Sequence, residues 1–191
     1  MDASELSPAA KRVVIAGTML ALMVAAINQT VVSTALPRII GELGGLSLFS
    51  WVFTSYMLTS TAIVPLVGKL SDLYGRKPFL IAGILIFMAT SAAAGASQNI
   101  EQLIVFRGMQ GLGAGMIMAN SFAVIGDLYP PAERGKYQGL FSGVAPMVLG
   151  LPHHRCLYDV LAALPDTALG VMAIALGGGI AILVPFLVLT V

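Results

Sequence analysis

Six long apolar segments fill most of this chain and constrain its fold more than any other feature. They lie at about residues 13–36, 50–70, 79–97, 103–126, 137–151 and 167–191. Most of them reach the ~20 residues with which a helix crosses a bilayer. Backbone in hydrocarbon must satisfy its hydrogen bonds internally, as helices or as a closed barrel, and these runs lack the alternation of barrel strands. The sequence therefore predicts an all-α membrane protein.

Composition supports a membrane environment. Of 191 residues, 58% are hydrophobic and 10% are charged, whereas a soluble domain is about 25% charged. This composition makes membrane lipids the expected surroundings. The net charge of +1 gives no reason to expect a nucleic-acid partner. The first apolar run is longer than the ~7–15 residues of a signal-peptide core. We therefore expect residues 1–12 to form a tail before a retained first span.

Lysine and arginine are distributed unevenly between the loops. With the N-terminus in the cytoplasm, the cytoplasmic side holds Lys11, Arg12, Lys69, Arg76, Lys77, Arg134 and Lys136, and the outer side holds Arg38 and Arg155. Positive residues favour the cytoplasmic side of short loops. We therefore expect a cytoplasmic N-terminus in a multi-pass protein of the plasma membrane, which in a bacterium is the inner membrane.

The segment GKLSDLYGRKP at residues 68–78 concentrates charge between the second and third spans. Asp72 and Arg76 are four residues apart, so they can pair on a helical turn. Gly68 would let another backbone approach closely, and Gly75 permits a sharp turn. The charge alone is equally consistent with a topogenic stop.

Span four contains a buried charge and a row of small residues. An arginine in hydrocarbon is costly and usually marks a pathway or a paired site, although Arg107 could instead extend outward towards Glu101. Gly111, Gly115 and Ala119 recur every four residues and predict a face for close helix packing. The GLGAG sequence follows no strand, which argues against a phosphate-binding loop.

Span one carries a patch of polar side chains within hydrocarbon. These are Asn28, Gln29, Thr30, Ser33 and Thr34. Polar groups at this depth need partners or a watery cavity. The patch is therefore either a contact between helices or the wall of a cavity.

Four stretches resemble motifs of the major facilitator superfamily, in the order that family has them. GKLSDLYGRKP (68–78) is similar to its signature loop between helices 2 and 3, and INQTVVSTALPRI (27–39) to the end of helix 1 in the fourteen-helix drug:proton antiporter branch. RGMQGLGAGM (107–116) resembles its helix 4 motif, and DLYPPAERGKYQG (127–139) the following loop. The resemblance covers about residues 13–145 and implies the N-terminal six-helix half of such a transporter.

The resemblance implies function as well as fold. It implies efflux of amphipathic small molecules by alternating access coupled to protons, without enzymatic activity, cofactor or metal. The expected pathway residues are Asn28, Thr30, Thr34, Arg107 and Gln110. The expected cytoplasmic gate consists of Gly68, Asp72, Gly75, Arg76, Lys77 and Asp127. A second six-helix half, on another chain or in a longer one, is the expected partner.

The sequence departs from the family at Asn28, where relatives carry an aspartate. An amide cannot titrate, so proton coupling would need Arg107 together with a carboxylate elsewhere. The alternatives are uptake or exchange of a polar solute without proton coupling, and a non-transporting fragment or partner-binding protein.

After about residue 145 the resemblance is expected to end, in a short fifth span and a polar patch with His153, His154 and Cys156. Adjacent histidines on a helix point about 100° apart and no fourth ligand is apparent, so no metal site is expected. The sequence is consistent with a fragment, a frame-shifted product or a natural half-transporter.

Overall fold

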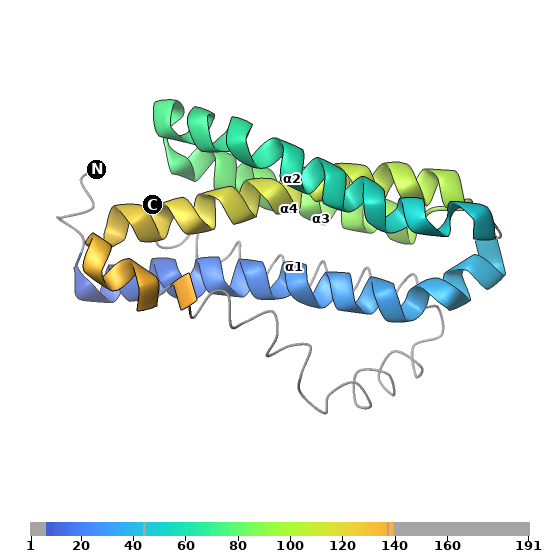
Figure 1. Cartoon of the computed structure of the whole chain (residues 1–191), viewed down its shortest axis with the longest axis horizontal. Coiled ribbons are helices and arrows are strands. Elements are labelled where there is room, and N and C mark those ends of the chain that lie inside the picture. The colour runs from blue at the N-terminus through green and yellow to red at the C-terminus, as the bar shows by residue number, and fades with distance from the viewer. Residues whose placement is uncertain (1–6, 44, 137, 140–191) are drawn as a thin grey trace.

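The computed structural model describes residues 7–43, 45–136 and 138–139. Four long helices follow one another in antiparallel order (Figure 1). They are α1 (Pro8–Leu43), α2 (Phe49–Tyr74), α3 (Arg76–Gly95) and α4 (Ile100–Leu128), with the short 3-10 helix η1 (Leu46–Leu48) before α2. Span six, nearly all of span five, and the patch with His153, His154 and Cys156 lie outside the described residues.

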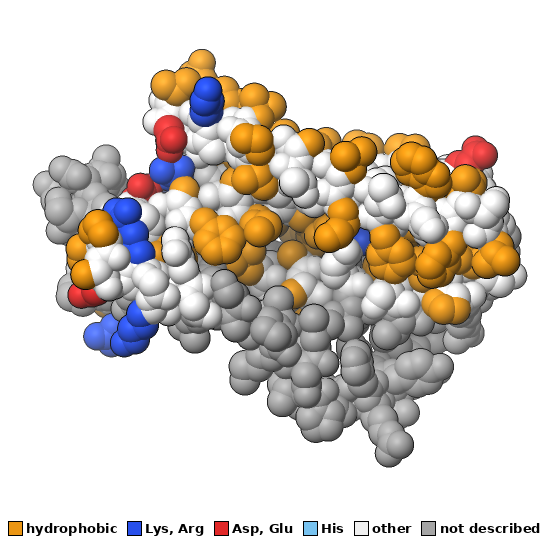
Figure 2. Space-filling model, in the orientation of Figure 1, with side chains coloured by type: hydrophobic (Ala, Val, Ile, Leu, Met, Phe, Trp, Pro, Cys, Tyr) orange, Lys and Arg blue, Asp and Glu red, His pale blue; other side chains and the backbone are white. Residues whose placement is uncertain are grey.

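Four stretches of the described chain are long and apolar enough to cross a membrane, one in each of α1, α3 and α4 and one that joins η1 to α2. These stretches are Ala9–Gln29, Leu46–Tyr74, Arg76–Gly95 and Ile100–Leu128, and the described residues contain no strand. The prediction of an all-α membrane fold is therefore confirmed. Large apolar side chains on α2, α3 and α4 remain exposed, as Figure 2 shows on one face, which suits a surface solvated by lipid.

The ends of the helices show why the chain turns where it does. Gly75 separates α2 from α3 with φ 91° and ψ 154°, a conformation that glycine adopts without the steric cost of a Cβ. At the opposite end, the side chain of Asn99 caps α4 by accepting a hydrogen bond from the Gln102 backbone at 2.9 Å. The Gln102 side chain accepts one from the Gln98 backbone at 3.0 Å.

Helix α4 is the centre of the arrangement, because it contacts α1, α2 and α3. Three buried apolar clusters follow its length. The first joins Ala21 and Val24 of α1 to Ile84 and Phe87 of α3 and Ala114 of α4. The other two lie nearer its ends and also join α1 to α4. A helix that is buried on most sides needs small residues wherever a neighbouring backbone approaches it.

Glycines of α4 meet both neighbouring helices. A Cβ built at Gly111 would lie 3.1 Å from the carbonyl carbon of Tyr56 in α2 and would overlap its oxygen. A Cβ at Gly113 would lie 2.7 Å from the backbone nitrogen of Phe87 in α3. Gly115 similarly meets the backbone of Ser60. The close packing predicted for Gly111 and Gly115 is present, and Gly113 adds a second such face towards α3.

Two hydroxyl groups of α2 form hydrogen bonds across its contact with α4. Ser55 donates to the backbone oxygen of Ile104 at 3.2 Å, and Thr59 donates to that of Gly108 at 2.7 Å. Both acceptors are main-chain carbonyls of α4, so close backbone approach and hydrogen bonding reinforce one another. The two helices therefore pack along their lengths without a bulky layer between them.

We expect Gly111→Ala to destabilise the bundle, because the new methyl group would overlap main-chain atoms that cannot rotate away. Overpacking of this kind costs about 1–3 kcal/mol. Gly126→Ala in the same helix is the control, since a Cβ at Gly126 meets nothing within 4 Å and alanine is the better helix former. The measurement is the thermal unfolding midpoint of each purified protein in detergent. Equal midpoints for Gly111→Ala and the parent would contradict the close packing.

Candidate functional site

A buried arginine of α4 joins that helix to α1. The side chain of Arg107 in α4 is 1% exposed, so it does not extend to the surface as the alternative interpretation required. Its Nη1 donates to Asn28 Oδ1 at 3.1 Å and to Gln110 Oε1 at 2.6 Å. Its Nη2 donates to Gln29 Oε1. Three amide oxygens, two of them from α1, therefore hold one guanidinium.

Helices α2 and α3 complete the site. The ring of Tyr56 in α2 lies against the guanidinium, with Arg107 Cζ 4.3 Å from the ring centroid. Gln110 Nε2 donates to Ser91 Oγ of α3, so the amide that accepts from Arg107 is itself oriented by another helix. We call Arg107, Asn28, Gln29, Gln110, Tyr56 and Ser91 the Arg107 cluster. All four described helices contribute to it.

The acceptors in the Arg107 cluster are neutral. Glu101 is six residues away on the same helix, about 9 Å along its axis, and Asp127 is about 30 Å away. Burial of an arginine in a membrane helix is costly, up to about 2.5–3.5 kcal/mol at the helix centre on insertion scales. Here amide dipoles and an aromatic face offset that cost, while no described carboxylate neutralises the charge.

Part of the Arg107 cluster was expected from the sequence. The structure brings together Asn28, Arg107 and Gln110, which were three of the expected pathway residues. Thr30 and Thr34 lie on α1, but their side chains are outside what the structure describes. Tyr56 and Ser91 were not anticipated. Each is a polar side chain within an apolar run, a signal that marks a candidate but does not show which cluster it joins.

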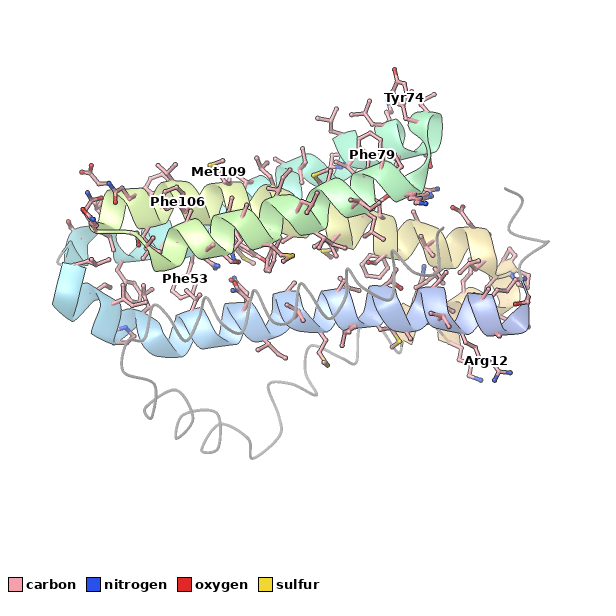
Figure 3. All side chains as sticks on the ribbon, turned by 180° about the vertical axis from the view of Figure 1, so that it is seen from behind. Arg12, Phe53, Tyr74, Phe79, Phe106 and Met109 are labelled. Carbon is pink, nitrogen blue, oxygen red and sulfur yellow. The ribbon has the colours of Figure 1, made fainter. Side chains whose placement is uncertain are left out.

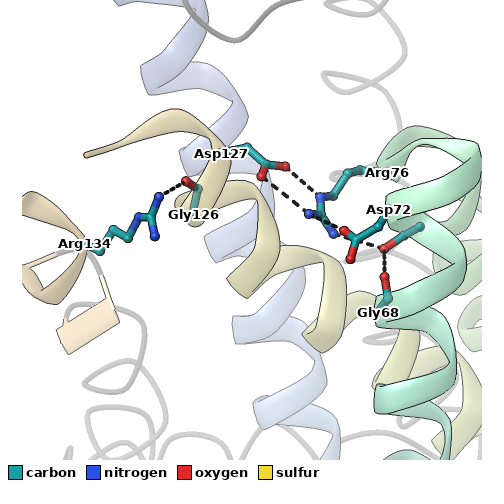
Figure 4. A network of polar contacts seen from close by, with 7 residues as sticks. Gly68, Asp72, Arg76, Gly126, Asp127 and Arg134 are labelled. Atoms are coloured by element: carbon teal, nitrogen blue, oxygen red, sulfur yellow. Dashed lines mark hydrogen bonds and ion pairs between the residues drawn. The ribbon is translucent and has the colours of Figure 1, made fainter. Parts of the chain in front are cut away.

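A second polar network lies where α2 ends and α3 begins, which we call the α2–α3 end (Figure 4). Arg76 Nε contacts Asp127 Oδ2 of α4 at 2.7 Å, and Arg76 Nη2 contacts Asp72 Oδ1 of α2 at 2.6 Å. Arg76 Nη1 donates to Ser71 Oγ at 3.1 Å, and Ser71 donates to the Gly68 backbone oxygen at 3.0 Å. A single guanidinium at the start of α3 thus binds both neighbouring helices.

This network includes most of the residues expected at a gate. Asp72, Arg76 and Asp127 form the ion pairs, and Gly75 makes the turn that brings Arg76 to them. Lys77 is exposed beside them. A Cβ built at Gly68 meets no described atom within 4 Å, so the close approach expected there is not made by the described residues.

Arg134 forms a separate contact just after α4. Its Nη2 donates to the Gly126 backbone oxygen at 2.7 Å and its Nε to that of Tyr129 at 2.9 Å. Carbonyls at a helix C-terminus lack intrahelical partners, and a cation there also interacts favourably with the helix dipole. Arg134 therefore stabilises the end of α4 next to Asp127.

The sequence matches a known protein family. The sequence model described as Major Facilitator Superfamily matches residues 18–190. Two Bacillus subtilis proteins are similar: Multidrug transporter protein MdtP is 46% identical over 134 residues, covering 70% of this chain and 25% of the relative. Multidrug resistance protein 3 is 41% identical over 144 residues, covering 75% and 28% respectively.

The relatives are much longer than this chain. An uncharacterized MFS-type transporter of Mycobacterium tuberculosis, Rv1877, is 38% identical over 139 residues, which are 73% of this chain and 20% of the relative. The aligned part is thus about a quarter of each relative. The family match continues to residue 190, past residue 145, where the resemblance was expected to end. With its motifs, its helices and a match over most of its length, the chain belongs to the major facilitator superfamily.

Proposed function

We propose that the chain acts as the N-terminal six-helix half of a transporter that exports amphipathic small molecules by alternating access. The observation that carries this proposal is the Arg107 cluster, a charged and polar site inside membrane-spanning helices. Such intramembrane groups are usually retained for a substrate or ion pathway. The multidrug names of two relatives support the substrate class. The activity proposed is transport rather than catalysis.

In this proposal the Arg107 cluster lines a cavity shared with a second six-helix half. Transporters built from two repeats bind their substrates near the bilayer midplane, between the repeats. Asn28, Thr30, Thr34, Arg107 and Gln110 are the proposed lining residues. The second half would belong to the same longer protein or to another chain. Proton coupling would use a carboxylate outside the Arg107 cluster.

A second candidate function is uptake or exchange of a polar solute without proton coupling. The observation in its favour is Asn28, an amide that cannot carry a proton and that accepts a hydrogen bond from Arg107 at 3.1 Å. Transport that does not respond to a pH gradient would favour this second candidate over drug export. A chain that transports nothing would be a membrane-bound fragment or a partner-binding protein.

Flux in membrane vesicles tests the proposal. We expect vesicles with the chain and a second half from a relative to move ethidium, a cation, or fluorescein, an anion, faster than vesicles with that half alone. A pH gradient should accelerate the movement. Arg107→Gln should lower the flux at least tenfold per molecule of protein in the membrane, because it removes the charged centre of the cluster.

Arg12→Gln is the matched control for this experiment. It also removes one positive charge, but Arg12 is exposed on α1 and projects away from the other helices (Figure 3). Its flux should equal that of the parent. Unchanged flux in Arg107→Gln, or none in the parent, would refute the proposal.

We also propose that the Arg76 network is a gate at the cytoplasmic side. The excess of lysine and arginine in the loops of the α2–α3 end supports this orientation. Exposed ion pairs contribute little singly, and Asp72 and Asp127 are 61% and 48% exposed. A network that joins three helix ends can nevertheless bias two conformations that differ by a few kcal/mol.

A buried reporter at this end tests the gate. Leu128 is 9% exposed at the end of α4, so Leu128→Cys on a Cys156→Ser background should react slowly with an impermeant maleimide. We expect Asp127→Asn or Arg76→Gln to raise its reaction rate several-fold in inside-out vesicles, with no reaction in intact cells. Lys69→Gln, which removes an exposed charge at the same end, is the control. If the cysteine reacts at the same rate in the gate variants as in Lys69→Gln, residues 68–78 act only as a topogenic signal. If the cysteine is labelled in intact cells, the α2–α3 end lies on the outer side of the membrane.

A further inference from the structure

We propose that the Arg107 cluster binds a carboxylate, and that the preferred substrate of this chain is an amphipathic carboxylate rather than a lipophilic cation. As a statement about substrates this rests on the proposed transport function. As a statement about binding it rests only on the geometry of the cluster. Three features carry it: an unbalanced charge, unused hydrogen-bond donors, and apolar surroundings.

The charge of Arg107 is unbalanced within the described part of the chain. Asn28, Gln29 and Gln110 contribute oxygen atoms but no negative charge. The described carboxylates that form ion pairs, Asp72 and Asp127, lie at the α2–α3 end and are already bound to Arg76. A buried charge is normally paired. An anion that enters the cluster would therefore supply the missing counter-charge.

The donors of Arg107 also remain partly unused. A guanidinium has five N–H groups, and three are taken by the oxygens of Asn28, Gln110 and Gln29. Nε is buried and has no acceptor among the described residues. Nε and Nη2 are neighbouring nitrogens of one guanidinium, and Gln29 accepts from Nη2 on the less buried side of the group. A carboxylate that replaced Gln29 at Nη2 would reach Nε as well and accept two parallel hydrogen bonds from this side of the guanidinium.

The surroundings of the Arg107 cluster are apolar, because buried members of two apolar clusters flank it. Val24 and Val32 lie one helical turn to either side of Asn28 on α1, and both are buried. Leu103 lies one turn before Arg107 on α4 and is also buried. The Gln29 side of the cluster is the least buried, since the contact from Arg107 to Gln29 is part-buried while those to Asn28 and Gln110 are buried. A ligand would therefore approach Nη2 along this side.

The Arg107 cluster is unfavourable for a lipophilic cation. Such a cation would meet the like charge of Arg107 in a poorly solvated site, where repulsion is weakly screened. The ring face of Tyr56, which could otherwise attract a cation, is already covered by Arg107. Replacing Asn28 by aspartate would change the first of these conditions, because a carboxylate would stand where Oδ1 now lies, 3.1 Å from Nη1, and would offset the charge of Arg107.

A pair of probes of similar shape and opposite charge tests the inference. The probes are 2-naphthylacetate, a carboxylate, and 2-(2-naphthyl)ethylammonium, a cation, measured by equilibrium dialysis against the full 191-residue chain in nanodiscs of uncharged phosphatidylcholine. We expect the parent to bind the carboxylate at least tenfold more tightly than the ammonium. Asn28→Asp should weaken carboxylate binding at least tenfold and strengthen ammonium binding, because it supplies an internal counter-charge.

Two further variants separate the proposed contact from general effects. Gln98→Glu adds the same negative charge at an exposed position in the turn before α4, and it should leave both affinities unchanged. Arg107→Lys keeps the charge but loses the paired N–H groups, so it should retain the preference for the carboxylate at lower affinity. Circular dichroism and gel filtration verify that each variant is folded.

The results can overturn the inference independently of the proposed function. Equal affinity of the parent for both probes would overturn it, as would equal effects of Asn28→Asp and Gln98→Glu. Carboxylate binding without any flux in vesicles would refute transport and leave the binding site intact. Flux without a preference for the carboxylate would leave transport intact and refute the binding site.

Discussion

The burial of one guanidinium sets the conditions that the rest of the bundle has to meet. Arg107 is 1% exposed in this structure, so the partners that offset its charge and occupy its donors come from the protein. Two of those partners are on α1 and one is on α4, while Tyr56 of α2 covers a face of the group. Separation of α1 from α4 would therefore break hydrogen bonds as well as apolar contacts. The Arg107 cluster therefore links α1 to α4, which already packs against α2 and α3.

Glycines allow α2 and α3 to pack closely against α4. With Gly111 and Gly115 facing α2 and Gly113 facing α3, α4 presents main chain rather than side chains to two neighbours. Larger side chains of α4 lie between these contacts, such as Met116 next to Gly83 of α3. Arg107 and Gln110 reach the neighbouring helices through hydrogen bonds, Arg107 to α1 and Gln110 to Ser91 of α3. The helix that packs most closely through its main chain therefore also carries the polar site.

The sequence was sufficient to predict features that depend only on residues close together in the chain. Apolar length predicted the helices, Gly75 predicted the turn, and the four-residue spacing predicted the pairing of Asp72 with Arg76. The grouping of Asn28, Arg107 and Gln110 was expected only through family resemblance. Tyr56 and Ser91 were missed because their membership depends on the relative rotation and depth of different helices. Those are set by packing across the whole bundle, which no local pattern encodes.

The hydroxyl of Thr59 has a mechanical consequence. It has one proton and three carbonyl oxygens within reach: Ser55 at 2.9 Å, Tyr56 at 3.2 Å and Gly108 at 2.7 Å. The first two belong to its own helix and the third to α4. If α2 and α4 slide past one another, the proton can turn back to its own helix, so no donor is stranded in hydrocarbon. Thr59 Oγ1 therefore has an acceptor on its own helix as well as on α4, and its proton can stay hydrogen-bonded in either position.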